Sequence, residues 1–415
     1  MPRFIADLHV HSRYSIATSQ DMAIAEVAAW ARRKGIALMG TGDFTHPKHR
    51  QEIVATLRED GRGLLVPKDG VGSVRFVLST ELSAVYTEGG KTRKVHLLVY
   101  APTLAAVDAL IRALQVRGRL DADGRPTFAM SARDLARVVL DTCPDCMVIP
   151  AHAWTPWFSV FGANSGFDSL EECFQDMTPH IKAIETGLSS DPAMNWRLSQ
   201  LDRITLISNS DAHSPSRIGR EANIFDCELD YWQLKEVIET RDRSRFLMTI
   251  EFFPEEGKYH FDGHRRCGVV FSPEETKRHG GCCPVCGRPL TVGVMHRVDE
   301  LADRPPGFVP PDAIPAVHLI PLQEIIAEAL GQGVDTVGVQ NEYMRLVAEA
   351  GSEFRLLLDL EEAQLAAFVP ERILLGITRV RQGKLHIVPG HDGEFGKIKI
   401  FAEEEQSSQD QLSLF

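Results

Sequence analysis

Histidine and aspartate residues form two closely spaced pairs that could bind a metal ion. His9 and His11 are two positions apart, and so are Asp211 and His213. Side chains two apart on a β-strand point to the same face, so each pair can present two ligands in one direction. Imidazole together with carboxylate suits divalent ions such as zinc, manganese or iron. The spacing predicts a metal site that draws on both pairs.

Further acidic and histidine residues extend this prediction to a second site. Glu81 can bridge two ions, and His96 and His152 supply additional nitrogen ligands. Any one of these residues could equally be an ordinary surface or core residue. Together they end successive predicted strands, which is hard to explain by chance, and an unpaired buried carboxylate would be costly. We therefore expect a polynuclear centre, with these candidate catalytic residues: His9, His11, Glu81, His96, His152, Glu185, Asp211 and His213.

Short apolar, β-branched runs alternate with amphipathic segments of helical length up to about residue 250. Helices are expected over 21–34, with Asp21 as N-cap, over 104–117 and over 131–142. Such alternation predicts parallel strands, and seven or eight units close most readily into an α/β barrel. The polar candidates fall mostly at the C-terminal ends of the runs, where barrel enzymes gather catalytic groups. The predicted strands span residues 4–11, 36–43, 74–86, 94–101, 147–154, 181–187 and 204–213.

The metal-ligand motifs resemble, in order, those of the polymerase-and-histidinol-phosphatase (PHP) family. The motifs are Asp7-Leu-His-Val-His-Ser, Ser79-Thr-Glu81, Val95-His96, Ala151-His152 and Ser210-Asp211-Ala-His213. The resemblance implies a distorted seven-stranded β/α barrel with three clustered metals and phosphoester hydrolysis. By position, His9, His11, Glu81 and Asp211 would hold the first ion, Glu81, His96 and His152 the second, and His213 would help to hold the third.

Two departures from the family pattern concern the third ion. Ser15-Ile16-Ala17 stands where many members have an acidic or histidine residue, and Thr41-Gly42-Asp43 replaces a Thr-Asp-His triplet. Asp43 is the preferred substitute ligand, with His46 behind it. Glu185 is either a ligand or a residue that supports one.

A second metal site is predicted from cysteine spacing. His264 and Cys267, followed after fifteen residues by Cys283 and Cys286, have the spacing of a four-ligand structural zinc ribbon. Cys282 is out of register, and His260 and His296 are alternatives to His264. Cys143 and Cys146 have the same short spacing but no second pair nearby, so a turn between a helix and a strand is preferred.

Composition excludes some classes of function. No apolar run approaches the ~20 residues that span a bilayer, and the first residues do not read as a secretory signal, so we expect a cytoplasmic, nucleoid-associated protein without membrane contact. The formal charge of −12 argues at first against nucleic acid. Residues 258–297, however, hold seven Lys/Arg against three Asp/Glu. The phosphate contacts predicted in this segment are Arg265, Arg266, Lys277, Arg278 and Arg288.

The last five residues, Gln411, Leu412, Ser413, Leu414 and Phe415, follow an acidic polar segment and resemble the peptide that binds bacterial sliding clamps. Such an extended peptide can place its apolar side chains in a preformed pocket while its polar residues fix the register. A sliding clamp is therefore a predicted partner.

The combination of these parts resembles the endonuclease Q family over residues 1 to about 400. The zinc segment contributes Cys283-Pro-Val-Cys-Gly-Arg-Pro-Leu and His296-Arg-Val-Asp-Glu-Leu-Ala-Asp. The resemblance implies incision of damaged DNA on the 5′ side of a deaminated base (uracil, hypoxanthine or xanthine) or an abasic site. We expect zinc at the structural site, and zinc, Mg²⁺ or Mn²⁺ at the active site. The expected domains are a catalytic barrel (1–250), a zinc module (251–305), a mixed helical α/β domain (306–402) and a flexible tail (403–415).

An enzyme of this kind must test bases, and turning the lesion out of the stack costs least when the base is mispaired. Trp154, Trp157 and Phe158 follow the candidate ligand His152 and are predicted to form a pocket wall or a stacking wedge, although such aromatics are often plain core. Arg217 and Arg220 are predicted to hold a flanking phosphate. The alternatives are a small-molecule phosphatase, which needs neither zinc ribbon nor clamp peptide, and a DNA-binding adaptor that has lost catalysis.

Overall fold

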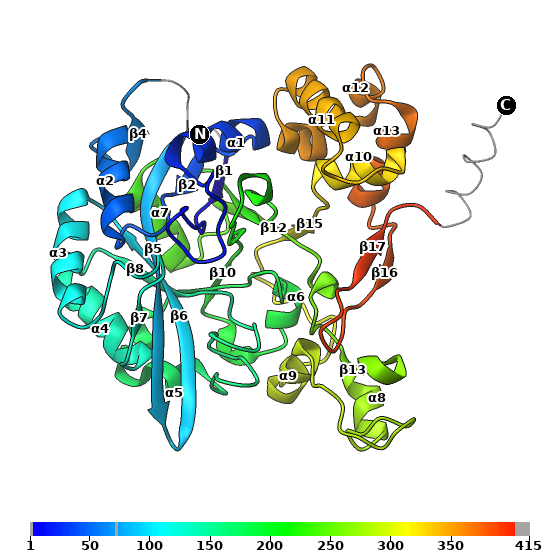
Figure 1. Ribbon diagram of the computed structural model, residues 1–415, viewed down its shortest axis with the longest axis horizontal. Helices are drawn as coiled ribbons and strands as arrows, with labels where there is room; N and C mark the ends of the chain where they lie inside the picture. The colour runs from blue at the N-terminus through cyan, green and yellow to red at the C-terminus, as the bar shows by residue number, and fades with distance from the viewer. Residues whose placement is uncertain (1–2, 71–73, 403–415) are drawn as a thin grey trace.

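The computed structural model describes residues 3–70 and 74–402 (Figure 1). The predicted clamp peptide, residues 411–415, lies outside the described residues. The main lobe contains the described residues up to about 251, and a large mixed sheet occupies its centre. The strands of this sheet follow the order β15-β12-β11-β1-β2-β5-β4-β3, with β6 and β7 paired to β5 and β8 paired to β6. Within the described residues no helix is long and apolar enough to cross a membrane.

Each of the seven predicted runs contains a strand. These are β1 (Phe4–Asp7), β2 (Leu38–Gly40), β5 (Arg75–Glu88), β6 (Lys91–Ala101), β8 (Met147–Pro150), β9 (Ala183–Glu185) and β10 (Thr205–Ile207). The sequence reading missed β3 (Leu57–Glu59), β4 (Leu65–Pro67), β7 (Thr127–Phe128), β11 (Ala222–Phe225), β12 (Phe246–Glu251) and β15 (Ala316–His318). Most of the missed strands are only two to four residues long, too short for an alternating pattern to stand out.

The expectation of an all-parallel sheet is wrong. β1–β2 and β2–β5 are parallel, but β5–β6, β6–β8, β1–β11 and β11–β12 are antiparallel. The reason is clearest between β5 and β6, where no helix intervenes and Gly89 and Gly90 turn the chain with φ of +58° and +75°. Successive positive φ values are what a two-residue hairpin turn requires, and glycine adopts them without strain.

A separate parallel pair, β9 and β10, lies beside the main sheet. Hydrogen bonds connect it on both sides. Ala153 N–H donates to the Glu185 carbonyl at 2.9 Å, next to β8, and Ser208 N–H donates to Asn223 Oδ1 at 2.9 Å, on β11. The carboxyl ends of β8, β9 and β10 are thereby held close together.

The three expected helices are confirmed as α1 (Ile24–Lys34), α3 (Leu104–Gln115) and α4 (Ala132–Thr142). The N-cap role predicted for Asp21 is wrong, because the N-cap is Ala23 and the Ile24 N–H donates instead to Glu52 Oε1 at 3.2 Å. Thr103 and Ser131 cap α3 and α4 with their hydroxyls. The other helices of the main lobe are α2 (Pro47–Thr56), α5 (Leu170–Phe174), α6 (Pro192–Asn195) and α7 (Tyr231–Thr240).

The remaining elements form two smaller parts (Figure 1). One contains β13 (Asp262–His264), β14 (Val269–Phe271), α8 (Pro273–Arg278) and α9 (Val294–Leu301). The other contains α10 (Leu322–Leu330), α11 (Val337–Ala350), α12 (Glu362–Leu365) and α13 (Glu371–Arg381), and the hairpin of β16 (His386–Val388) and β17 (Lys397–Lys399) runs between the two. β15 lies beyond the expected boundary at residue 306, yet it pairs with β12 and extends the central sheet.

A buried ion pair joins the C-terminal helices to the main lobe. Lys34 Nζ lies 2.8 Å from Glu353 Oε2, and both side chains are almost wholly buried. Glu353 also accepts hydrogen bonds from the Tyr343 hydroxyl and the Leu322 N–H. Its carboxylate is therefore tied to α1, α10 and α11 at once.

We expect Lys34→Met to lower the free energy of unfolding by about 3–5 kcal/mol, because it leaves the Glu353 carboxylate buried without its cation. The decrease is measured by chemical denaturation at neutral pH. Arg32→Met on the exposed side of the same helix is the matched control and should change stability by less than about 0.5 kcal/mol. Equal denaturation midpoints for the two variants would contradict the expectation.

Candidate functional site

The two predicted histidine and aspartate pairs lie side by side, His9 and His11 just after β1 and Asp211 and His213 just after β10. Val10 and Ala212 form a parallel bridge, and the His11 N–H donates to the Ala212 carbonyl at 3.0 Å. This pairing brings Asp211 Oδ1 to 3.0 Å from His11 Nε2 and 3.6 Å from His9 Nε2. These three residues form one group whose ligand atoms could hold a metal ion.

A second group consists of Glu81 on β5, His96 on β6 and His152 just after β8. Glu81 Oε1 lies 2.7 Å from His96 Nδ1 and 3.0 Å from His152 Nε2. The other oxygen, Glu81 Oε2, lies 3.4 Å from His11 Nε2 in the first group. The carboxylate of Glu81 therefore reaches both groups, as expected of a residue that bridges two ions.

Several of these ligand atoms are buried without a hydrogen-bond partner. They are His9 Nε2, His11 Nε2, Glu81 Oε2 and Asp211 Oδ1. These four atoms face one another at 3.0 to 4.0 Å without hydrogen-bond geometry, and polar atoms buried in this way are costly unless a common partner satisfies them. A divalent cation fits this set, because neutral imidazole and carboxylate are its usual ligands.

The electrostatics of the groups agree with this fit. Burial alone would raise the pKa of Asp211 and of Glu81, but the surrounding imidazoles hold both pKa values well below the usual range. Burial would lower the pKa of the two histidines, yet carboxylates outweigh it and raise the pKa of His9 to about 9 and that of His11 to about 10. The carboxylates therefore favour a positive charge at this point, held as protons on the two imidazoles when no metal is bound. A divalent cation would take the place of those protons and bind the neutral rings.

Glu185 and Asp43 lie behind the ligands. Both oxygens of Glu185 face His9 Nδ1, at 3.0 and 3.1 Å, and the His152 N–H donates to Oε2 at 2.9 Å. Asp43 Oδ1 lies 3.1 Å from His11 Nδ1, while its Oδ2 accepts from the backbone and hydroxyl of Ser12 and from Ser15. Carboxylates in this position fix the orientation of a ligating imidazole.

The geometry corrects the prediction that Asp43 is a direct ligand. Both of its oxygens are engaged by protein donors, and it belongs to neither group of ligand atoms. His46, the residue predicted behind it, stacks on Tyr14 with ring centroids 4.8 Å apart. His213 lies closer to the centre, with its ring 4.6 Å from that of His11 and its Nδ1 2.8 Å from the Asp211 carbonyl.

The four predicted zinc ligands also come together. His264, Cys267, Cys283 and Cys286 each offer an atom within 4.8 Å of the others. The three residues left aside or weighed as alternatives lie outside this group: Cys282 is exposed, His260 is buried elsewhere, and His296 Nδ1 is paired with Asp262 at 2.6 Å. Cys143 and Cys146 belong to a turn in which the Cys146 N–H donates to the Cys143 carbonyl.

One predicted DNA contact, Trp154, is wrong, and another, Arg220, has a second role in the structure and stays a prediction. Trp154 is only 1% exposed, packs on Phe161 and donates its indole N–H to Asn195, so it is part of the core. Arg220 donates to the Ser210 carbonyl at 2.9 Å and so supports the backbone that carries Asp211. A sequence pattern does not distinguish a buried tryptophan such as Trp154 from an exposed one.

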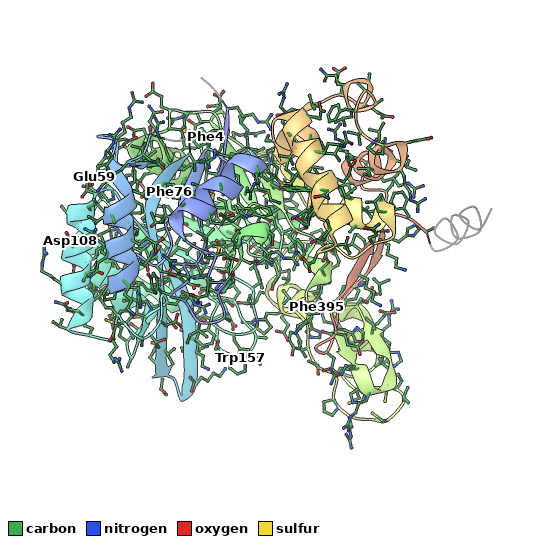
Figure 2. The ribbon with its side chains drawn as sticks, turned by 45° about the horizontal axis from the view of Figure 1, so that its top comes forward. Phe4, Glu59, Phe76, Asp108, Trp157 and Phe395 are labelled. Atoms are coloured by element: carbon green, nitrogen blue, oxygen red, sulfur yellow. The ribbon has the colours of Figure 1, made fainter. Side chains whose placement is uncertain are left out.

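Trp157 and Phe158 remain candidates for contact with a ligand. Trp157 is 51% exposed and lies at the edge of the main lobe in Figure 2, with Lys94 Nζ 5.0 Å from its ring centroid. Phe158 is half-buried, has a φ of +62° and lies 4.7 Å from the ring of His96. These two aromatic residues therefore connect the second ligand group to the surface.

The basic residues predicted to bind phosphate differ in their contacts. Arg265 and Arg266 are exposed, whereas Lys277 pairs with Asp299 and Arg278 with Glu274 at 2.5 Å. Arg217 pairs with Glu324 at 2.8 Å.

Sequence reasoning missed two residues next to the ligand groups. Asn209 donates to Glu185 Oε1 at 3.0 Å and orients it. Arg125 places its Nε 3.9 Å from Glu81 Oε2. Neither residue belongs to a spacing pattern that marks ligands, and Arg125 lies in an irregular segment.

The fold and the two ligand groups that share Glu81 define a metal-dependent hydrolase of phosphate esters. A solved structure of the lesion-specific endonuclease PfuEndoQ from Pyrococcus furiosus is 32% identical, with a TM-score of 0.85 over 98% of this chain and 99% of that chain. A structure of endonuclease Q with a 27-mer duplex carrying an abasic lesion at its active site is 33% identical, with a TM-score of 0.84 over 97% and 98% of the two chains. The chain belongs to the endonuclease Q family.

Two curated relatives match this chain, one over nearly its whole length and one over part of it. The YqxK protein of Bacillus subtilis strain 168 is 30% identical over 414 residues, which covers 96% of this chain and all of that protein. The MJ0043 protein of Methanocaldococcus jannaschii is 31% identical over 274 residues, which is 63% of this chain but only 33% of that longer protein. Residues 321–384 match the family described as the MJ0043 C-terminal domain.

Proposed function

We propose that this protein is a metal-dependent endonuclease that cuts DNA at damaged nucleotides. The observation that carries the proposal is the pair of ligand groups joined by Glu81, in a chain whose solved relative holds a duplex with an abasic lesion at its active site. Deaminated bases are the further substrates proposed, with incision on their 5′ side. The parts outside the main lobe supply DNA affinity that a small phosphate ester would not need.

The strands of the main lobe are proposed to close into a distorted seven-stranded barrel. The support is the set of hydrogen bonds that connect β9 and β10 to β8 on one side and to β11 on the other. Such a ring would place the candidate ligands on one rim. The proposed division of labour is catalysis in residues 1–250, DNA contact in 251–305 and a supporting domain in 306–402.

The active-site residues have separate tasks in this proposal. One divalent cation would be held by His9, His11, Asp211 and Glu81. A second would be held by Glu81, His96 and His152, and His213 lies nearby. Bound cations of this kind lower the pKa of a water nucleophile and neutralise charge at the scissile phosphate. Glu185 and Asp43 keep the His9 and His11 rings in the orientation that leaves Nε2 free. Zinc, Mg²⁺ and Mn²⁺ all suit this set, and zinc suits the His264, Cys267, Cys283 and Cys286 group.

The DNA surface is proposed to run from the ligand groups to the zinc module. Trp157 and Phe158 are suited to stack on an unpaired base, because an aromatic face accepts any base. They could equally fill the space that a base leaves in the duplex when it turns out of the stack. Arg265 and Arg266 are exposed and free to contact phosphates, which contributes affinity without sequence preference. Arg217 would exchange its Glu324 partner for a phosphate.

The test is an oligonucleotide duplex carrying a single deoxyuridine, hypoxanthine, xanthine or abasic site, incubated with Mn²⁺ or Mg²⁺. The expected product is a nick on the 5′ side of the lesion with a 3′-hydroxyl. An undamaged duplex is the control substrate. A protein that leaves every damaged duplex whole while it hydrolyses a phosphate monoester is instead a small-molecule phosphatase, and the proposal fails.

A sliding clamp is the proposed protein partner, bound through Gln411 to Phe415. Deleting these five residues is expected to abolish capture of the protein by an immobilised bacterial clamp, since the peptide would supply the apolar anchors of that contact. Nicking of short oligonucleotides should be unchanged, because no candidate ligand lies in the tail. Equal clamp binding by the full-length and shortened proteins would contradict this prediction.

A further inference from the structure

Arg125 is held beside Glu81 by the pairing of two strands. β7 runs parallel to β5, with Thr127 opposite Ser83 and Phe128 opposite Ala84. Continuing that register by two residues on each chain brings Arg125 level with Glu81, and side chains at matching positions of paired strands lie on the same face. The Ser83 N–H donates to the Pro126 carbonyl at 3.0 Å and extends the pairing towards Arg125. The position of Arg125 is thus coupled to the strand that carries the bridging ligand.

The other side of Arg125 is fixed against the loop that follows His11. The Gly124 N–H donates to the Tyr14 carbonyl at 3.1 Å. A methyl group at Gly124 would collide with Ser15 Oγ and with the carboxylate of Asp43, so only glycine allows the two segments to approach this closely. Asp123 accepts from the Ile16 N–H at 3.1 Å and from the Arg125 N–H at 3.3 Å. The segment before β7 is therefore attached to both halves of the ligand set.

The Arg125 guanidinium lies over the candidate metal centre with most of its donors available. Its side chain is 22% exposed, and Nε lies 3.9 Å from Glu81 Oε2. The one hydrogen bond described for the guanidinium is a long one, 3.5 Å from Nη2 to the Ile16 carbonyl. Glu81 reaches both ligand groups through its two oxygens, so the guanidinium beside it lies near both. Arg125 is thus near both ligand groups, but its closest described ion-pair distance to them is the 3.9 Å to Glu81.

A guanidinium in this place needs an anion. Two divalent cations held by the ligand groups would repel a neighbouring guanidinium, and the Glu81 carboxylate beside it already faces four imidazoles. A phosphodiester would satisfy the cations and the guanidinium together. The planar guanidinium presents its N–H groups in a fixed fork that matches two oxygens of one phosphate.

We propose that Arg125 binds a non-bridging oxygen of the scissile phosphate and is a phosphate-binding residue of this enzyme. The inference rests on the proposed endonuclease function and adds a residue to it. It assigns a role to the segment between α3 and β7, which the ligand motifs leave out.

The first test compares nicking by Arg125→Ala, Arg125→Lys and wild-type protein on a duplex with one abasic site. Loss of a preorganised donor at a reacting phosphate is expected to slow single-turnover nicking on the order of a hundredfold. Lysine should recover part of the rate, because it keeps the charge but loses the fork. Arg119→Ala is the matched control, since Arg119 belongs to the same segment, is 79% exposed and pairs with Asp121. Wild-type nicking by Arg125→Ala would overturn the inference.

The second test separates contact with the phosphate from a merely structural role. Equilibrium binding is measured in Ca²⁺ with duplexes that carry either a phosphate or a neutral methylphosphonate at the scissile position. Wild-type protein should bind the methylphosphonate more weakly, and the penalty should be clearly smaller for Arg125→Ala, in which only the bound cations still contact the charged oxygens. Equal penalties in the two proteins would place Arg125 away from that phosphate and overturn the inference.

The same variants distinguish failure of this inference from failure of the proposed function. If the wild-type protein nicks no damaged duplex, the proposed function fails. Binding of inorganic phosphate to the Mn²⁺-loaded proteins then decides the role of Arg125, with at least tenfold weaker binding by Arg125→Ala expected. Equal binding by wild-type protein and Arg125→Ala would overturn the inference in that case as well.

Discussion

Asp211→Asn is expected to reduce metal-dependent nicking by more than a hundredfold and to lower the amount of metal bound at the active site. Asp211 Oδ1 is buried without a hydrogen bond and lies 3.0 Å from His11 Nε2 and 3.6 Å from His9 Nε2. Asparagine has nearly the same shape but no negative charge, so it removes the anionic ligand of the first group. The loss should exceed the roughly 10- to 100-fold effect of removing a residue that only supports a ligand.

The measurement pairs single-turnover nicking with metal analysis of the dialysed protein. Asp141→Asn, an exposed aspartate at the end of α4, is the matched control and should behave as wild type in both assays. Excess Mn²⁺ should restore part of the Asp211→Asn activity if weaker metal binding is the cause. Nicking at the wild-type rate, with wild-type metal content, would show that Asp211 is not a ligand and that the first group does not form the active site.

The ligand pairs could be predicted from the sequence because their signal is local. A spacing of two on an extended chain puts both side chains on one side, and this spacing marks residues that the fold does bring together, although His9 and His11 lie just beyond β1 and the other pair lies just beyond β10. Asp211 has a φ of +47°, so its pair is not part of a regular strand. The bridge between Val10 and Ala212 that joins the two pairs is a contact across the fold, so only a resemblance to known motifs could suggest it. The four candidate zinc ligands could be predicted for a similar reason, because their spacing along the chain is itself typical of a zinc ribbon.

Properties that depend on the strand register could not be predicted in this way. The direction of β6 follows from a Gly-Gly turn, and β11 and β12 lie antiparallel in the sheet although the alternating pattern suggests parallel strands. Trp154 has the residue type of a DNA contact, but its packing on Phe161 places it inside the protein. Burial is a property of the whole fold, whereas residue type is not.

Arg125 is a residue near the ligand groups that the sequence did not mark as functional. Nothing in residues 119–126 resembles a ligand motif, and the segment has an exposed arginine and aspartates at its start. The two-residue strand β7 is what aligns it with Glu81. A strand so short has no recognisable alternation, so its partner is known only once the fold is known.

Cys283→Ser is expected to abolish zinc binding by the module and to expose its basic segment to protease. The buried apolar core around Cys283 contains only Val269 and Leu290, with Phe271 partly buried beside it. So small a core cannot hold a segment of this length, and a four-ligand zinc site supplies on the order of 10 kcal/mol to such a fold. Serine cannot replace the thiolate ligand. The variant should therefore contain one zinc fewer per chain, with this segment unfolded locally.

Limited proteolysis with trypsin is a sensitive measurement here, because Arg265, Arg266, Lys277, Arg278 and Arg288 all lie in the segment. The variant should be cut there much faster than wild type, and its affinity for duplex DNA should fall with the loss of the phosphate contacts proposed for Arg265 and Arg266. Hydrolysis of a small phosphodiester by the main lobe should persist, which separates loss of DNA binding from loss of catalysis. Cys282→Ser is the matched control, since Cys282 is exposed and lies outside the ligand group although it is the adjacent residue. An unchanged zinc content in Cys283→Ser, or equal cutting of the two variants, would mean that the four residues do not hold the module together.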